Sequence, residues 1–532
     1  MARLSTERSE ESALQSSPPA APRSDTLEGF FPQLVKPLQA SLALLAIVLF
    51  ACSSNGLAQS LPEKAQHAKE LMAAGKPGEA IPIYRELIRA IPDNPGLILN
   101  LGLALDMSGN KLDAIRQYEA VLKLDPDSLP ALLLMGTAYL DLGQPEKAIT
   151  PLEKSAKIQP ESFEAQVTVA EAEMVLGRYE QAAPRFQKLS QQDPSSAKAW
   201  YGLGGCYEGL AQKSFDELAD AAPGSAYWLN LVAESRLDAK QTYSAFYFYR
   251  QALAKIPSMR GVHAAIAGIY KEEGHPDWAS TEDEKEKQLP APDCAAEKLE
   301  CEYTAGDFLA IVQSEPKTAE GLYWKARAYN KLALKAYLRL SALPPSVETH
   351  ELKAKIESKR RQFLEAAKEW REALKLSPGN LHIQKELAIA LYQSGDLQGA
   401  ETLLQELVKR EPDATDLNYL LGDSILNSQK PQEAIPYLEK VVEADRQMLR
   451  AQRSLGLAYL QTGQAEKAIA HLKEALPIDQ DGSVHYQLGR AYQAHGDREL
   501  SSAMLKQYQE IQRAQQAENK MVEKEVVITP PE

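Results

Sequence analysis

The sequence is poor in the residues and motifs with which most enzymes do chemistry. It has 4 cysteines and 8 histidines in 532 residues, and it contains no glycine-rich phosphate loop, no zinc-protease helix motif and no serine nucleophile elbow. The densest histidine group, His471, His485 and His495, lacks the spacing of a metal-ligand motif. We therefore predict a protein that is not an enzyme and that has neither a cofactor nor a metal site.

An excess of basic residues is also missing. The chain has 59 Lys and Arg residues against 73 Asp and Glu residues, which gives a net charge of −14. An acidic body is unsuited to phosphate backbones, so we expect no nucleic-acid partner. The acidic balance is otherwise typical of a surface that keeps a protein in solution.

A long apolar run occurs only near the start of the chain. Residues 1–35 are polar and rich in Ser, Pro and Glu, which favours disorder. Lys36 then precedes the apolar run 38–52, and Gly56 and Ala58 suit a cleavage site before Gln59. We predict that residues 1–58 are a polar leader followed by a secretory signal peptide. Two alternatives stay open: a retained membrane anchor, although the run is shorter than the ~20 residues of a membrane span, or a mis-assigned start codon.

A cysteine within this run allows a further, lesser alternative. Cys52 follows Leu49, Phe50 and Ala51, which resembles a lipoprotein box in which lipid is attached to the cysteine, although Phe50 replaces a small residue. With a signal, an anchor or a lipid, the rest of the chain lies outside the cytoplasm. We expect a periplasmic protein, or one anchored in a membrane and facing the periplasm.

The body of the chain repeats one pattern, which is clearest in residues 95–128, PGLILNLGLALDMSGNKLDAIRQYEAVLKLDPDS. Small residues at positions 8 and 20 of this unit let two helices approach, and large apolar residues surround them at helical spacing. Pro126 cannot continue the second helix. The same frame returns in 61–94, 129–162 and 163–196, and Trp200 opens the signature W-x-x-L-G-x-x-Y. The pattern resembles the tetratricopeptide repeat, a helix–turn–helix unit of about 34 residues.

The resemblance implies an all-α fold, a right-handed superhelical solenoid of such hairpins. We expect two arms, 59–289 and 321–514, joined by a degenerate connector 290–320 that contains prolines and cysteines, and a disordered tail 515–532. In the unit that begins near Trp200 we expect a second helix cut short at Pro223. Residues 210–223 match 332–345, which indicates an old duplication in which both arms share this junction.

Two cysteines flank the sequence CAAEKLEC. On one continuous helix Cys294 and Cys301 would lie ~10 Å apart, too far for a disulfide, but they could meet if Cys294 lies in the turn before the helix. We predict a disulfide there, and two separate thiols are the alternative. Cys206 is expected to be a small buried residue in a first helix of a unit.

The resemblance also implies a concave groove lined by the first helix of each unit. Transferred to this chain, the groove residues are Leu99, Leu103, Met107, Leu133, Thr137, Val167, Glu171, Met174 and Tyr201. Such an apolar groove suits an amphipathic helix or an apolar peptide, unless these residues only pack neighbouring repeats.

The expected function is a non-catalytic scaffold or adaptor that binds other proteins in bacterial envelope assembly, secretion or export. An accessory subunit of an envelope enzyme complex, such as one for polysaccharide synthesis or export, is the alternative. The fold implied by the resemblance does not choose between them, because function resides in the site.

Overall fold

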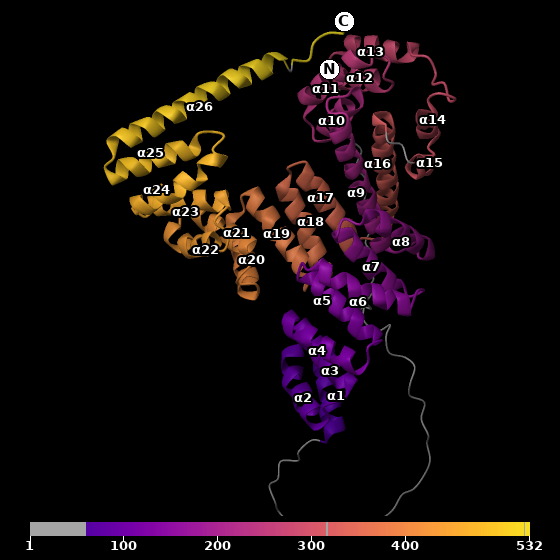
Figure 1. Cartoon of the computed structure of the whole chain (residues 1–532), viewed down its shortest axis with the longest axis vertical. Coiled ribbons are helices and arrows are strands. Elements are labelled where there is room, and N and C mark those ends of the chain that lie inside the picture. The colour runs from indigo at the N-terminus through magenta and orange to yellow at the C-terminus, as the bar shows by residue number, and fades with distance from the viewer. Residues whose placement is uncertain (1–59, 315–317, 526, 532) are drawn as a thin grey trace, which may run out of the picture. The chain divides into compact units, whose positions relative to one another are not determined.

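The computed structural model describes residues 60–314, 318–525 and 527–531, which form a solenoid of paired helices (Figure 1). The leader, the apolar run 38–52 and Cys52 lie outside the described residues. Among the helices that the structure describes, none combines the length and the apolar character needed to cross a membrane.

The described helices follow one another, most of them with short turns. They are α1 (Leu61–Ala73), α2 (Pro77–Ala90), α3 (Pro95–Met107), α4 (Lys111–Leu124), α5 (Leu129–Asp141), α6 (Pro145–Ile158), α7 (Phe163–Val175), α8 (Tyr179–Gln192), α9 (Ala197–Ala221), α10 (Ala226–Asp238), α11 (Thr242–Lys255), α12 (Val262–Glu272), α13 (Pro276–Gln288), α14 (Lys298–Ala305), α15 (Phe308–Gln313), α16 (Ala319–Ser341), α17 (Val347–Lys359), α18 (Phe363–Leu376), α19 (Leu381–Ser394), α20 (Leu397–Arg410), α21 (Thr415–Asn427), α22 (Pro431–Ala444), α23 (Leu449–Gln461), α24 (Ala465–Ala475), α25 (Ser483–His495) and α26 (Arg498–Glu525). A 3-10 turn, Leu476–Ile478, follows α24.

Local sequence explains where the helices of each unit begin and end. Asn94 and Ser162 cap α3 and α7 by accepting a hydrogen bond from a backbone N–H of the first turn. Pro77 occupies the first position of α2, where its missing N–H costs nothing. Gly109 has φ +82° and makes the tight turn from α3 to α4, a conformation that is cheapest for glycine. The units predicted for 61–196 therefore fold as four helical hairpins.

A glycine in the first helix of a unit lets a large side chain of the second helix come close. A Cβ added to Gly102 would lie 2.6 Å from Cε1 of Tyr118, and one added to Gly136 would lie 2.4 Å from Leu152. A Cβ added to Gly422 would lie 2.8 Å from the side chain of Leu438. These contacts identify the partner helix within each hairpin, because each glycine and its large neighbour occupy the same positions of the repeat.

The unit that opens at Trp200 departs from the prediction. Instead of a hairpin with a short second helix, residues 197–221 form the single 25-residue helix α9. The helical pattern does not stop, since Leu210 and Leu218 are both buried along it. The glycine at the repeat position, Gly204, meets Tyr337 of α16, where an added Cβ would lie 2.3 Å from the ring.

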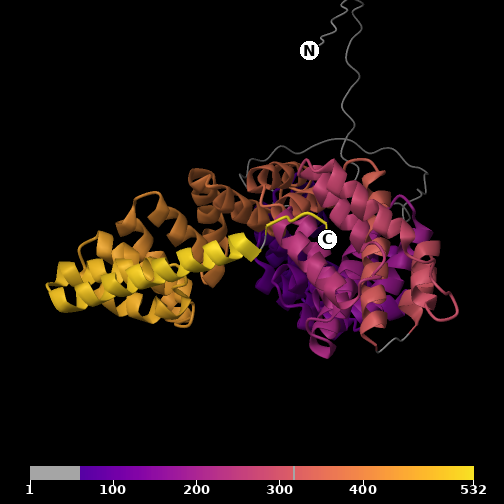
Figure 2. The ribbon, with the colours of Figure 1, turned by 90° about the horizontal axis from the view of Figure 1, so that it is seen from above.

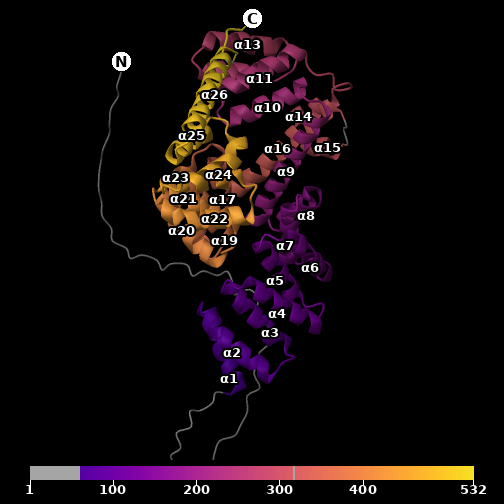
Figure 3. The same cartoon turned by 60° about the vertical axis from the view of Figure 1, so that its left-hand side comes forward.

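Helix α16 is therefore the second helix of this unit, although it lies far along the chain. It packs along α9, and the rings of Tyr207 and Tyr329 lie 6.0 Å apart (Figures 1 and 3). Helix α17 then packs on α9 as the first helix of the next unit. The solenoid thus runs from α1 to α9 and continues through α16 to α26, so one repeat is split.

Residues 222–318 are an insertion within the split repeat, and we call α10–α15 the inserted branch. Its helices pair as α10 with α11, α12 with α13 and α14 with α15, and the branch packs on α9 and α16. We predicted two arms separated by a connector at 290–320. In the structure, the connector residues belong to the inserted branch, which packs on α9 and α16. The duplicated stretches 210–223 and 332–345 instead belong to two helices that pack on each other.

The C-terminal residues also differ from the predicted disordered tail. Helix α26 runs to Glu525, and residues 527–531 follow it as extended chain. Gln512 and Gln515 donate side-chain hydrogen bonds of 2.7 Å to the carbonyls of Asp481 and Gln480, respectively. These bonds tie α26 to the turn that precedes α25.

Candidate partner-binding groove

The first helices of the second and third units carry the most accessible part of the predicted groove. Met107 on α3 is 50% exposed, and Leu103 is partly exposed one turn before it. Leu99 and Leu133 are partly buried and pack against the hydrophobic cores of these units. Thr137 on α5 is exposed, and its hydroxyl donates to the carbonyl of Leu133 at 2.9 Å. The structure therefore presents an apolar strip on α3 with a small polar edge on α5.

The fourth unit contributes less to an open groove than the sequence suggested. Val167 is 1% exposed and belongs to the core that also contains residues of α8, α9 and α16, so it has no surface for a partner. Met174 is partly buried against the same core. Both residues pack neighbouring repeats, which was the alternative interpretation of the groove.

Helix α17 of the same chain covers the groove at α9. The Lys355 ammonium donates to the Tyr201 hydroxyl and lies 5.0 Å from the centre of its ring. Lys359 pairs with Glu208 at 3.1 Å. Because α17 supplies these contacts, Tyr201 is a contact between repeats of the chain itself.

The carboxyl group of Glu171 lies in the same region. Burial raises its pKa, the ammonium of Lys198 opposes that rise, and the carboxylates of Glu164, Glu348 and Glu351 add to it. In turn, Glu171 raises the pKa of Lys198. The structure thus gathers acidic groups around the carboxyl of a partly buried residue of α7.

The groove of the inserted branch is filled by α16, which the sequence did not reveal. On the groove side of α10, Asn230 donates to the Tyr323 hydroxyl at 2.6 Å, and Glu234 pairs with Arg327 at 3.1 Å. The rings of Tyr227 and Tyr323 lie 5.1 Å apart. No local pattern signals this contact, because its two sides are about ninety residues apart in the sequence.

In the later units the groove carries a closed polar network. Asp423 accepts hydrogen bonds from Tyr392 at 2.6 Å, from Ser454 at 2.5 Å and from Asn427 at 2.9 Å. These bonds join α19, α21 and α23, the first helices of three successive units. The network therefore fixes the register of the repeats and leaves little of Asp423 exposed.

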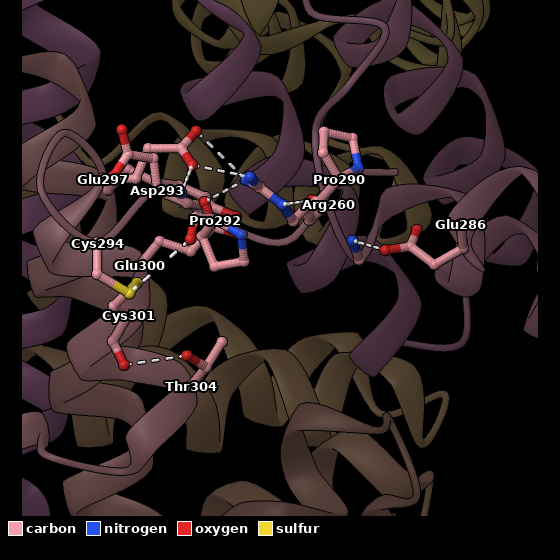
Figure 4. A network of polar contacts seen from close by, with 12 residues as sticks. Arg260, Glu286, Pro290, Pro292, Asp293, Cys294, Glu297, Glu300, Cys301 and Thr304 are labelled. Carbon is pink, nitrogen blue, oxygen red and sulfur yellow. Dashed lines mark hydrogen bonds and ion pairs between the residues drawn. A yellow bond between two sulfur atoms is a disulfide. The ribbon is translucent and has the colours of Figure 1, made fainter. Parts of the chain in front are cut away.

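A charged network holds Arg260, just before α12, to the start of α14, and a disulfide ties the turn before α14 to α14 itself (Figure 4). Arg260 pairs with Glu297 and Glu300, both at 2.8 Å, and donates to the carbonyl of Pro290 at 3.0 Å. The sulfur atoms of Cys294 and Cys301 are bonded, and Cys294 lies in the turn before α14. The predicted connector is thus an ordered part of the inserted branch.

The remaining cysteine in the described residues is buried in a repeat. Cys206 has no exposed surface, and burial raises the pKa of its thiol to about 12, with a further contribution from Glu173. A neutral, buried thiol packs as a small apolar group.

The fold defines a class of protein: a solenoid of helical hairpins in which neighbouring units pack on one another. Family models agree with this class. One model described as "Tetratricopeptide repeat" matches residues 66–128, 169–210, 352–416, 385–447 and 419–483, and a second with the same description matches 108–172. The chain belongs to the tetratricopeptide repeat family, whose fold is generally a non-catalytic scaffold that binds other proteins. The matched residues stop at 210 and resume at 352, on either side of the inserted branch.

The chain is also similar to parts of several solved structures. "MamA 41-end from Desulfovibrio magneticus RS-1" is 26% identical over 33% of this chain and 99% of its own, with a TM-score of 0.30. A tetratricopeptide repeat protein from Parabacteroides merdae is 15% identical over 62% of this chain and 98% of its own, with a TM-score of 0.31.

Proposed function

We propose that the protein is a non-catalytic adaptor that binds an amphipathic helix or an apolar peptide of another protein on α3 and α5. The observation that carries the proposal is the half-exposed side chain of Met107 beside Leu103, on the concave positions of a repeat. Apolar side chains at helical spacing suit the apolar face of a partner helix. The contrast with α9 supports this placement, because α17 covers the equivalent positions there.

We further propose that this adaptor works outside the cytoplasm, in envelope assembly, secretion or export. The support comes from the sequence: Lys36, the apolar run 38–52 and the small residues Gly56 and Ala58 have the order of an export signal. The closeness of Cys294 and Cys301 fits an oxidising compartment. A fusion of residues 1–70 to a reporter that is active only outside the cytoplasm tests this, and an inactive reporter that is made at normal levels contradicts it.

Capture of partners from envelope extract by the full chain tests the groove. The groove variant Leu103→Glu/Met107→Glu/Thr137→Glu places charge on the concave strip at partly or fully exposed positions, which limits damage to the core. The matched control Leu112→Glu/Leu124→Glu changes residues of α4 that are 59% and 45% exposed. We expect one partner to be captured by the wild type and the control and to be lost from the groove variant, with equal helix content in all three.

A partner that the groove variant retains would contradict a site on α3 and α5. If the captured partner is an envelope enzyme whose activity depends on this chain, the accessory-subunit alternative would replace the adaptor. Both the adaptor and the accessory subunit would act without catalytic activity of this chain.

A further inference from the structure

The C-terminal segment of the chain lies on the inserted branch. The Tyr270 hydroxyl of α12 donates to the carbonyl of Thr529 at 2.5 Å. Ile528 packs against the hydrophobic core of the branch, and the adjacent Val527 is 50% exposed. Figures 1, 2 and 3 show the yellow segment after α26 ending at the helices of this branch. A short extended peptide is therefore bound to a folded helical surface within one chain.

The segment lies on a cluster of aromatic side chains, which we call the aromatic platform. The ring of Tyr270 lies 5.6 Å from that of Phe246 on α11 and 5.5 Å from that of Trp278 on α13. His275 stacks on Trp278 at 3.9 Å, so the third ring is held as well. Burial raises the pKa of Tyr270 to about 12, and the hydroxyl therefore stays protonated and able to donate. The three aromatic residues come from three helices of the branch, α11, α12 and α13.

The segment has the chemistry of a peptide ligand. It reads Val527, Ile528, Thr529, Pro530, Pro531, with one apolar side chain turned to the branch and a backbone carbonyl turned to the tyrosine. Proline fixes its own backbone angle and biases the residue before it towards the extended form. Little entropy is then lost when the peptide binds, which is the reason that proline-rich peptides are common ligands.

We propose that the aromatic platform on α11–α13 is a binding site for an extended Ile-Thr-Pro-Pro peptide and that its occupant is the protein's own C-terminal segment, bound in cis. This site is separate from the groove on α3 and α5. Tethering to α26 supplies the segment at an effective concentration in the millimolar range, so the segment stays bound even if its intrinsic affinity for the platform is weak.

Binding of a labelled peptide, VVITPPE, to the full chain tests the proposal by fluorescence anisotropy. In the receptor variant Ile528→Asp the chain's own segment should leave the platform, because a carboxylate would replace an apolar contact. We expect the peptide to bind this variant at least tenfold more tightly than it binds the wild type, in which the tethered segment competes. A labelled peptide with the same Ile-to-Asp change should not bind.

A hydroxyl deletion tests the named contact. Adding Tyr270→Phe to Ile528→Asp should weaken peptide binding about fivefold, the effect of one neutral hydrogen bond. The matched control Tyr243→Phe makes the same change at a residue of α11 that is 53% exposed, and it should leave binding unchanged. Circular dichroism of each variant establishes that helix content is retained.

Three results would overturn the proposal. Equal binding to the wild type and to Ile528→Asp would show that the tail does not occupy the platform, and no binding to either would remove the site. A wild type that is dimeric by light scattering, together with a monomeric Ile528→Asp variant, would show that the segment is exchanged between copies and would overturn binding in cis. Loss of the partner in the groove experiment affects none of these readouts.

Discussion

At the scale of single residues, the repeat depends on glycines that have no room for a side chain. Gly204 on α9 meets the ring of Tyr337, whereas Gly268 on α12 has no atom within 4 Å of the place where a Cβ would lie. Both glycines lie within helices, but only Gly268 has room for a methyl group. The same substitution should therefore have opposite effects on stability at the two positions.

We predict that Gly204→Ala destabilises the protein by about 1–3 kcal/mol, because the added methyl group forces the α9–α16 contact apart. Gly268→Ala should stabilise it by up to about 1 kcal/mol, because alanine has the higher helix propensity. Thermal unfolding followed by circular dichroism measures both. Equal effects of the two substitutions would argue against α16 as the partner of α9.

The carboxyl of Glu171 gives a prediction for pH dependence. Because burial raises its pKa in the folded state, ionisation at neutral pH opposes folding, and this cost disappears as the pH falls below the unfolded value. Glu171→Gln should therefore raise the melting temperature at about pH 7.5 and lose that advantage at about pH 4. The control Glu119→Gln, at an exposed position of α4, should show little change at either pH. A gain that is independent of pH would have another cause.

At the scale of elements, the segment between α13 and α14 is held by the Arg260 network and by the bond between Cys294 and Cys301. The short loop that this bond closes should stabilise the branch by about 2–3 kcal/mol through the unfolded state. Cys294→Ser/Cys301→Ser should lose that stability, and the wild type in reductant should fall to the same level. Titration of the denatured chain should reveal two more thiols with reductant than without it, and an equal count would exclude the disulfide.

Elements also show how far sequence reasoning reaches. Helices α1–α8 could be predicted because each hairpin is local: its caps, turn glycines and apolar spacing all lie within one repeat. The role of α16 could not be predicted. Tyr337 packs against Gly204 from far along the chain, and no local sequence pattern indicates that contact. The packing of Ile528 on the branch could not be predicted either, because a segment of five residues is too short to show a hydrophobic periodicity. Of the predicted groove residues, Leu103 and Met107 keep exposed surface, and their role stays a prediction. Tyr201 is covered by α17, a contact that only the fold reveals.

At the scale of the whole molecule, the split repeat predicts which part of the chain can be removed. Replacing residues 224–317 by a Gly/Ser linker of about six residues should leave α9 and α16 paired as an ordinary hairpin. Replacing 224–345 also removes α16 and leaves α9 without its second helix. We expect the shorter replacement to keep cooperative thermal unfolding and the longer one to lose it. Equal behaviour of the two would mean that α16 belongs to the branch alone.

The split repeat also has a consequence for the order in which the chain becomes structured during synthesis. Glu208 and Tyr337, which meet across α9 and α16 at 2.8 Å, are 129 residues apart. At ~5–20 residues per second a ribosome needs roughly 6–26 s to make that stretch. Helices α1–α8 can fold before α16 has been synthesised. During that time the apolar side of α9 is uncovered and accessible to chaperones and to neighbouring nascent chains. Residues 222–318 therefore determine how long that side stays uncovered, and their length sets a delay in the maturation of the solenoid.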